Sequence, residues 1–418
     1  MTAFDNVRRK RTTVMLAAGL AVLVAVAGLG YMGVKALRRY EGATKVGSDA
    51  IRIPPTPVGM LATVDAENRL TSISVMVLSP NAAPGGSILS LPVSGDSTLM
   101  LGPDRIPFSE VFATGGIDEL ALSVESALSV TLEVYQVADP AATETLLQPV
   151  GQVSATLTNA VAEDIPAGAA TLTAAQVVQV LNHTEEGQVD RARRGNVEAV
   201  WAGVAAAVGP GLAGATDATT TSAVTGGSAA PITFGSFPEL FTRLVSGPVG
   251  ARALPADLID AAMNPAGKDV ESLDRAECVM VLASIAPRSM SQPAPGLVYR
   301  IEAPAGYEAQ MRVAVALVLL GGGNVQSVYL NGPVRETTLI LVDDERLKDE
   351  ADSEGVFGAW EAAKPDSPIE GIDIIIQLGT EWLDAPPSVN TSTSTTVAAG
   401  DTTVPADSTV PTESTTSP

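Results

Sequence analysis

The stretch "VGMLATVDAENRLTSISVMVLSPNAAPGGSILSLPV" (residues 58–93) sets the fold class of this chain. Three apolar runs that contain β-branched residues, 58–65, 70–80 and 86–93, are separated by clusters of Asn, Pro, Gly and Asp. Runs of this length that are bounded by turn-forming residues are typical of β-strands. The stretch therefore predicts three successive strands.

Helical patterns follow these strands and alternate with further strands. Residues 115–128 place Ile117, Leu120, Val124 and Leu128 on one helical face. Further helices are predicted over 171–183, 196–209, 237–247 and 274–285, and further strands over 132–139 and 151–157. The alternation predicts an α/β fold. A Gly/Ala/Thr-rich segment, 211–230, is predicted to be a flexible loop.

A smaller α/β unit with its own pattern is predicted beyond Pro295. Its expected strands are 297–303, 324–330, 337–343 and 372–379, and its expected helices are 307–323 and 344–363. Strands and helices of these lengths indicate a second unit, a compact α/β sandwich.

The two ends of the chain differ from its body. Residues 12–34 are uncharged, and as a helix they would span about 35 Å, enough to cross the hydrocarbon core of a bilayer. A cleaved signal peptide would have a shorter apolar run, so we expect a retained transmembrane helix after a cytoplasmic basic tail, 1–11. The Ser/Thr/Pro-rich tail, 386–418, is predicted to be disordered and extracytoplasmic.

Charge limits the classes of partner. The chain carries 47 acidic and 25 basic residues, for a formal net charge of −22. Nucleic-acid binding depends on neutralising phosphates with Lys and Arg, so this balance argues against a nucleic-acid partner. The single cysteine, Cys278, lies in an apolar run and is predicted to be a buried core residue. No metal-ligand spacing accompanies it or the single histidine, His183.

Three segments resemble the LytR–CpsA–Psr (LCP) family. Residues 113–139, "ATGGIDELALSVESALSVTLEVYQVAD", resemble its central helix and strand, and 171–208 resemble its downstream helix, polar loop and arginine-led helix. The residues after Pro295, with "RVAVALVLLGGG" and "IDIIIQLGTEW", resemble the LytR C-terminal domain. The resemblance implies an LCP-like α/β sandwich with a central mixed sheet over 46–291, and a LytR C-terminal-like domain over 296–385.

The family resemblance also implies an activity. LCP enzymes move a glycopolymer from a lipid pyrophosphate carrier onto peptidoglycan outside the membrane, with Mg²⁺. This sequence departs from the family's motifs, because "PPTPVGMLATVD" holds no arginine and no acid before Asp65, and Val93 stands where an arginine is expected. Departure of a pyrophosphate needs stabilising cations. We therefore expect no catalytic residues, no metal site and no cofactor.

Arg191 and Arg194 do match the family's arginine pair. Arginines three apart share one helical face and are able to grip a phosphate, which makes them candidates for residual phosphate binding. Glu185, Glu186 and Asp190 also offer them ordinary surface ion pairs.

Two hypotheses follow. The first is a non-catalytic, single-pass envelope protein with its N-terminus in the cytoplasm, whose partners are the membrane and an envelope glycopolymer, peptidoglycan or another envelope protein. The second is an active LCP-type ligase that uses Mg²⁺ and displaced groups such as Asp96, Arg105, Arg191 and Arg194. The second requires at least two arginines and a carboxylate at a shared cavity, whereas the first predicts arginines that point to water. We expect the first.

Overall fold

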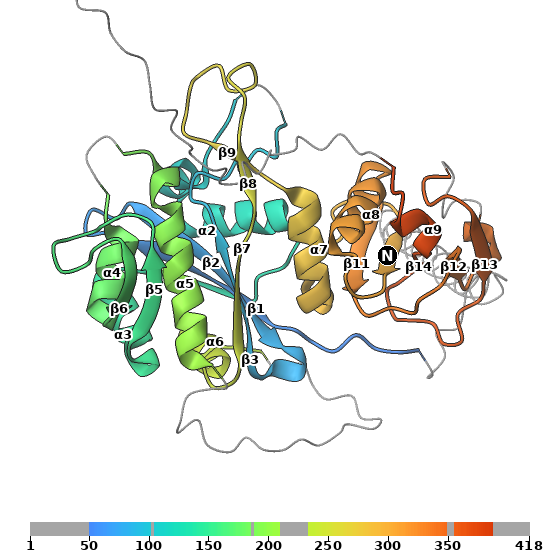
Figure 1. Ribbon diagram of the computed structural model, residues 1–418, viewed down its shortest axis with the longest axis horizontal. Coiled ribbons are helices and arrows are strands. Elements are labelled where there is room, and N and C mark those ends of the chain that lie inside the picture. The colour runs from blue at the N-terminus through green and yellow to red at the C-terminus, as the bar shows by residue number, and fades with distance from the viewer. Residues whose placement is uncertain (1–49, 102–103, 185–187, 210–232, 349–354, 388–418) are drawn as a thin grey trace, which may run out of the picture. The chain divides into compact units, whose positions relative to one another are not determined.

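The structure is a computed structural model of the 418-residue chain, and it describes residues 50–101, 104–184, 188–209, 233–348 and 355–387 (Figure 1). The predicted basic tail (1–11), transmembrane helix (12–34) and loop (211–230) lie outside the described residues, as does the predicted tail beyond residue 387. Among the described helices, none combines the length and apolarity needed to cross a membrane.

The predicted strands of residues 58–93 form the centre of a five-stranded mixed sheet. Its order is β4-β1-β2-β3-β7, with β1 antiparallel to β2, β2 antiparallel to β3, and both outer pairs parallel. The strands are β1 (Val58–Val64), β2 (Leu70–Ser79), β3 (Ala83–Leu91), β4 (Val134–Ala138) and β7 (Val249–Ala253). The prediction of an α/β fold with a central mixed sheet is confirmed.

Both faces of this sheet are covered, and the sequence explains why. Alternate residues of a strand point to opposite faces. Val75 and Val77 join the core beneath α2 and α7, whereas Met76 and Leu78 join the core beneath α3 to α6. Because both faces are buried, β1 is buried along its whole length, which accounts for its continuous apolar run.

The helices around this sheet are connected by short irregular elements. They are α2 (Phe108–Leu128), α3 (Pro140–Leu147), α4 (Ala174–Asn182), α5 (Arg194–Val208), α6 (Phe237–Leu244) and α7 (Arg275–Ile285). The 3-10 turns are η1 (Pro80–Ala82), η2 (Gln148–Val150), η3 (Asp190–Arg193) and η4 (Pro287–Ser289). Two small antiparallel hairpins pair β5 (Val153–Leu157) with β6 (Gly168–Leu172) and β8 (Ala256–Leu258) with β9 (Glu271–Leu273).

A second mixed sheet has the order β11-β10-β14-β12-β13. Its strands are β10 (Val298–Glu302), β11 (Asn324–Tyr329), β12 (Thr338–Val342), β13 (Trp360–Ala363) and β14 (Ile374–Gln377), with α8 (Glu308–Leu320), η5 (Glu345–Leu347) and α9 (Thr380–Leu383). The two sheets share one continuous hydrophobic core within a single compact unit. The domain division between residues 291 and 296 therefore stays a prediction.

Two sequence predictions were wrong in detail, and four strands were not predicted. In the described residues of the helix expected over 344–363, residues 355–363 are not helical, because Gly355 and Gly358 adopt positive φ and residues 360–363 instead pair with β12 as β13. The helix expected from residue 171 begins only after Thr173, whose side chain and that of Gln176 form a capping box. Strands β6 to β9 were not predicted, since they are short and largely lack apolar alternation.

Candidate functional site

Three arginines, Arg191, Arg193 and Arg194, form a cluster where η3 passes into α5, and they point in two directions. In a 3-10 turn, residues three apart eclipse one another. Arg191 and Arg194 accordingly both face segment 269–271, whereas Arg193 between them faces the central sheet. The predicted common face of Arg191 and Arg194 is therefore present, but acidic residues stand opposite it.

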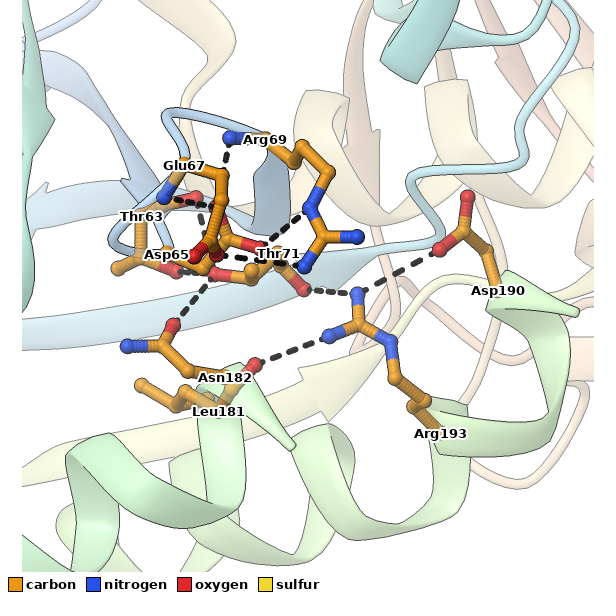
Figure 2. Close-up of polar contacts among 9 residues, drawn as sticks. All are labelled: Thr63, Asp65, Glu67, Arg69, Thr71, Leu181, Asn182, Asp190 and Arg193. Atoms are coloured by element: carbon orange, nitrogen blue, oxygen red, sulfur yellow. Dashed lines mark hydrogen bonds and ion pairs between the residues drawn. The ribbon is translucent and has the colours of Figure 1, made fainter. Parts of the chain in front are cut away.

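Arg193 is the buried member of the cluster, with 5% of its surface exposed. Its Nη2 donates to the main-chain oxygen of Thr71 at 2.9 Å, and its Nη1 donates to that of Leu181 at 3.1 Å (Figure 2). Asp190 lies 3.7 Å from Nη2, so the guanidinium also has a carboxylate partner. Burial lowers the pKa of Arg193, against the opposing effect of the charge on Asp190. Among the described residues, its buried Nε has no hydrogen-bond partner.

Figure 2 shows that Arg193 belongs to a polar cluster at the β1–β2 turn. The Asp65 carboxylate accepts from the main-chain N–H and the Nε of Arg69, which closes the turn. The Thr71 hydroxyl lies 2.9 Å from that of Thr63 and donates to Asn182 at the end of α4. These contacts position the Thr71 carbonyl that Arg193 binds.

Arg194 is held by four acceptors. Its Nε donates to Glu198 at 2.6 Å, and its Nη1 donates to Glu271 at 3.1 Å. The same Nη1 also donates to the carbonyl of Ala256, and Nη2 donates to that of Leu254. Its side chain is 22% exposed. Arg194 therefore ties the first turn of α5 to the β8–β9 hairpin.

Arg191 is the most exposed of the three arginines. Its side chain is 42% exposed and pairs with Asp269 through Nη1 at 3.2 Å. Surface pairs of this kind contribute little to stability. The phosphate-binding role suggested for Arg191 and Arg194 stays a prediction, and each of these side chains has an acidic partner.

A small cleft separates the cluster from strands β2 and β3. It is lined by Thr71, Ser72, Ser90, Leu91, Pro92, Val93, Ser94, Asp190, Arg193, Arg194 and Val197. Its volume of about 20 Å³ holds about one water molecule. Burial raises the pKa of Asp190, and the charge on Arg193 opposes that rise. Two arginines and one carboxylate therefore share a cleft, as the ligase hypothesis requires. The expectation that the arginines point to water is not met by Arg193 and Arg194, whose side chains are turned to partners within the chain.

The displaced catalytic set considered from the sequence is not assembled at this cleft. Of its four members, only Arg194 lines the cleft. Asp96 and Arg105 lie 3.6 Å apart and are both buried, and Asp96 accepts from the N–H groups of Thr98 and Met100. Arg193 and Asp190 were not predicted as site residues from the sequence. Arg193 contacts two main-chain carbonyls and the neighbouring Asp190, and contacts of this kind produce no sequence motif.

Cys278 is buried as predicted, with no exposed surface. Burial in α7 raises the pKa of its thiol, with smaller contributions in the same direction from Asp274 and Glu277. The thiol therefore stays protonated at neutral pH, and the nucleophilic thiolate is not formed.

Comparison with known proteins gives structural matches alone. No family model matches the chain, and neither does any curated protein. Among solved structures, it is similar to TagT of B. subtilis (15% identity, 54% of this chain and 88% of that chain, TM-score 0.37). It is also similar to TagU of B. subtilis (13%, 54% and 94%, TM-score 0.34) and to Lin1025 of Listeria innocua (15%, 57% and 100%, TM-score 0.36).

These similar structures are LCP proteins. The family that the sequence resembles is thus also the family of its structural neighbours.

Proposed function

We propose that this chain is a membrane-anchored, extracytoplasmic envelope protein that uses an LCP-like fold and a LytR C-terminal-like domain for binding or assembly, without catalysing transfer. One observation carries the proposal. The guanidinium groups of Arg191, Arg193 and Arg194 are all engaged by oxygen atoms of the chain itself.

A departing pyrophosphate needs cations that are free to meet its developing charge. Arg194 would have to leave Glu198, Glu271 and two carbonyl oxygens before it could do so. Removing the cation from a buried pair leaves an unpaired charge, which costs about 3–5 kcal/mol. The arginines therefore act as cross-links between α5, the central sheet and the β8–β9 hairpin.

The cellular location and the binding partners are proposed from the sequence. The uncharged span 12–34 supports a single-pass anchor with the N-terminus in the cytoplasm. The Ser/Thr/Pro-rich tail supports an extracytoplasmic position for the rest of the chain. We propose the membrane as one partner, and an envelope glycopolymer, peptidoglycan or another envelope protein as the other.

A specific observation supports the alternative, an LCP-type ligase. Arg193, Arg194 and Asp190 line one cleft, and the Nε of Arg193 is buried without a partner among the described residues. The carboxylates around the cleft do not fit a magnesium site, however. Glu271 is engaged by Arg194 and Ser94, and the described residues contain no cluster of metal-ligating side chains.

Transfer of a glycan from a lipid pyrophosphate carrier to peptidoglycan, with Mg²⁺ present, tests the proposal. The full chain, the double variant Arg191→Ala/Arg194→Ala and the control Arg288→Ala are compared in detergent micelles, after circular dichroism shows that each is folded. We expect no turnover above the protein-free reaction for any of them. Turnover by the wild type that the double variant loses and the control keeps would establish the ligase instead.

Binding is measured separately with the same proteins. We expect the wild type and Arg288→Ala to sediment with isolated peptidoglycan or with membranes that carry envelope glycopolymer. Wild-type protein that sediments with neither of these would contradict the binding role.

A further inference from the structure

A second group of polar side chains lies on the second sheet. Strands β11, β10 and β14 are parallel and end at the same edge of this sheet, where Glu302 of β10 is the register partner of Tyr329 in β11 and of Gln377 in β14. Binding sites of α/β sheets commonly form at the carboxyl ends of parallel strands. The last residues of these three strands therefore stand where a binding site is expected.

Hydrogen bonds join these three residues to two arginines. Arg300 donates from Nε to Glu302 at 2.6 Å, and its Cζ atom lies 5.3 Å from the centre of the Tyr329 ring. Gln377 donates to the other oxygen of Glu302 at 3.0 Å and accepts from Nη1 of Arg335 at 2.8 Å. We call these five residues the polar row, since each one contacts the next across the sheet.

The polar row lies on the face of the sheet opposite to the core. Tyr299 and Ile301, which flank Arg300 in β10, belong to the hydrophobic core that also contains residues of α8 and α9. Because alternate residues of a strand point to opposite faces, Arg300 and Glu302 point away from that core. Tyr329 is 45% exposed and the Arg300 side chain is 24% exposed, so a ligand at the surface is able to reach both.

The polar row has an excess of positive charge. It contains two guanidinium groups and one carboxylate, that of Glu302, which already pairs with Arg300. Arg335 donates to the neutral side chain of Gln377, and within the part of the chain that the structure describes it forms no ion pair. One unmatched cation close to an exposed aromatic ring suits a ligand that combines an acidic group with a ring.

We propose that the polar row binds a glycan chain that carries carboxylate groups. A sugar ring presents C–H groups on one face, which pack against an exposed aromatic ring such as that of Tyr329. Its hydroxyl groups donate to and accept from planar polar side chains such as Gln377, and the guanidinium of Arg335 matches the carboxylate. The inference rests on the proposed binding role of the chain, to which it adds the surface and the class of glycan.

Calorimetry with the full chain in detergent micelles, and trigalacturonic acid as the probe, tests the proposal. One comparison ligand is its trimethyl ester, which has the same rings without the charge, and another is N-acetyl-triglutamate amide, which has carboxylates without sugar rings. We expect the acid to bind about tenfold more tightly than either. No binding of the acid, or equal binding of the ester or of the peptide, would overturn the proposal.

Variants assign the binding to named residues. Arg335→Gln should weaken binding of the acid about tenfold and leave the weaker binding of the ester unchanged, because only the charge is lost. Arg346→Gln, the same change at an exposed arginine outside the polar row, should alter neither. Tyr329→Ala should weaken binding of both ligands severalfold, whereas Tyr329→Phe keeps the ring and the affinity. Unchanged affinity in Arg335→Gln and Tyr329→Ala would overturn the assignment.

Sedimentation separates a failure of this inference from a failure of the proposed function. Wild-type protein that sediments with peptidoglycan or glycopolymer-bearing membranes but does not bind trigalacturonic acid would overturn the inference alone. Wild-type protein that neither sediments nor binds the acid would contradict the proposed function as well.

Discussion

Arg193 donates a hydrogen bond of 2.9 Å to the main-chain oxygen of Thr71, although 122 residues separate the two in the chain. A second bond of 3.1 Å from the same guanidinium reaches the main-chain oxygen of Leu181. One buried cation thus connects β2, the end of α4 and the start of α5. Both acceptors are carbonyl groups inside the protein, and the planar guanidinium presents one N–H group to each of them.

Replacing Arg193 by methionine should destabilise the chain strongly. Methionine fills similar space but leaves two buried carbonyls and the Asp190 carboxylate without their donor, which costs about 3–5 kcal/mol. Urea-induced unfolding measures the change. The matched variant Arg191→Met removes an exposed ion pair and should cost less than about 1 kcal/mol. Similar losses for the two variants would contradict the structural role of Arg193.

Asp190 should make stability depend on pH. Burial raises its pKa in the folded chain above the reference value of 3.8, so the folded state favours the protonated form. Protonated Asp190 contributes stability that is fully present below the reference pKa. This contribution is lost as the pH rises through the higher pKa that Asp190 has in the folded chain. We therefore expect Asp190→Asn to gain stability relative to the wild type between about pH 4 and neutrality. A gain that is the same at every pH would be inconsistent with this origin.

Arg194 should be coupled unequally to its two glutamates. The side chain of Glu271 is 8% exposed and that of Glu198 is 32% exposed, so water screens the second pair more. Double-mutant cycles that combine Arg194→Met with Glu271→Gln or with Glu198→Gln measure each coupling by urea unfolding. We expect about 1–3 kcal/mol for the first pair and about 0.3–0.5 kcal/mol for the second. The reverse order would show that the buried pair is not formed in solution.

Gly203 should be required by the packing of α5 on β5. A Cβ atom there would lie 2.5 Å from the main-chain oxygen of Ser154, which cannot move without shifting the strand. In an exposed helix, alanine would stabilise by about 1 kcal/mol relative to glycine. Here we expect Gly203→Ala to destabilise by about 1–3 kcal/mol in thermal unfolding. The control Gly250→Ala, where nothing lies within 4 Å of the added atom, should change stability by less than about 0.5 kcal/mol.

The local elements of this fold were largely predictable. Runs such as those that became β1 and β10, and the helical face of Leu120, Val124 and Leu128, follow from periods of two and 3.6 residues. The prediction of a helix was wrong over 355–363, because it gave more weight to nearby charged residues of high helix propensity than to Gly355 and Gly358. There the parallel pairing of β13 with β12, a contact between distant segments, determined the outcome.

The sequence by itself determined the α/β class, the positions of the strands and helices that carry apolar periodicity, and the burial of Cys278. These depend on interactions within a few residues or on hydrophobicity alone. Only the tertiary structure decided that Arg193, and not Arg191, lines the same cleft as Arg194. Main-chain carbonyls have no residue signature, so their partners become identifiable only when distant segments have packed together.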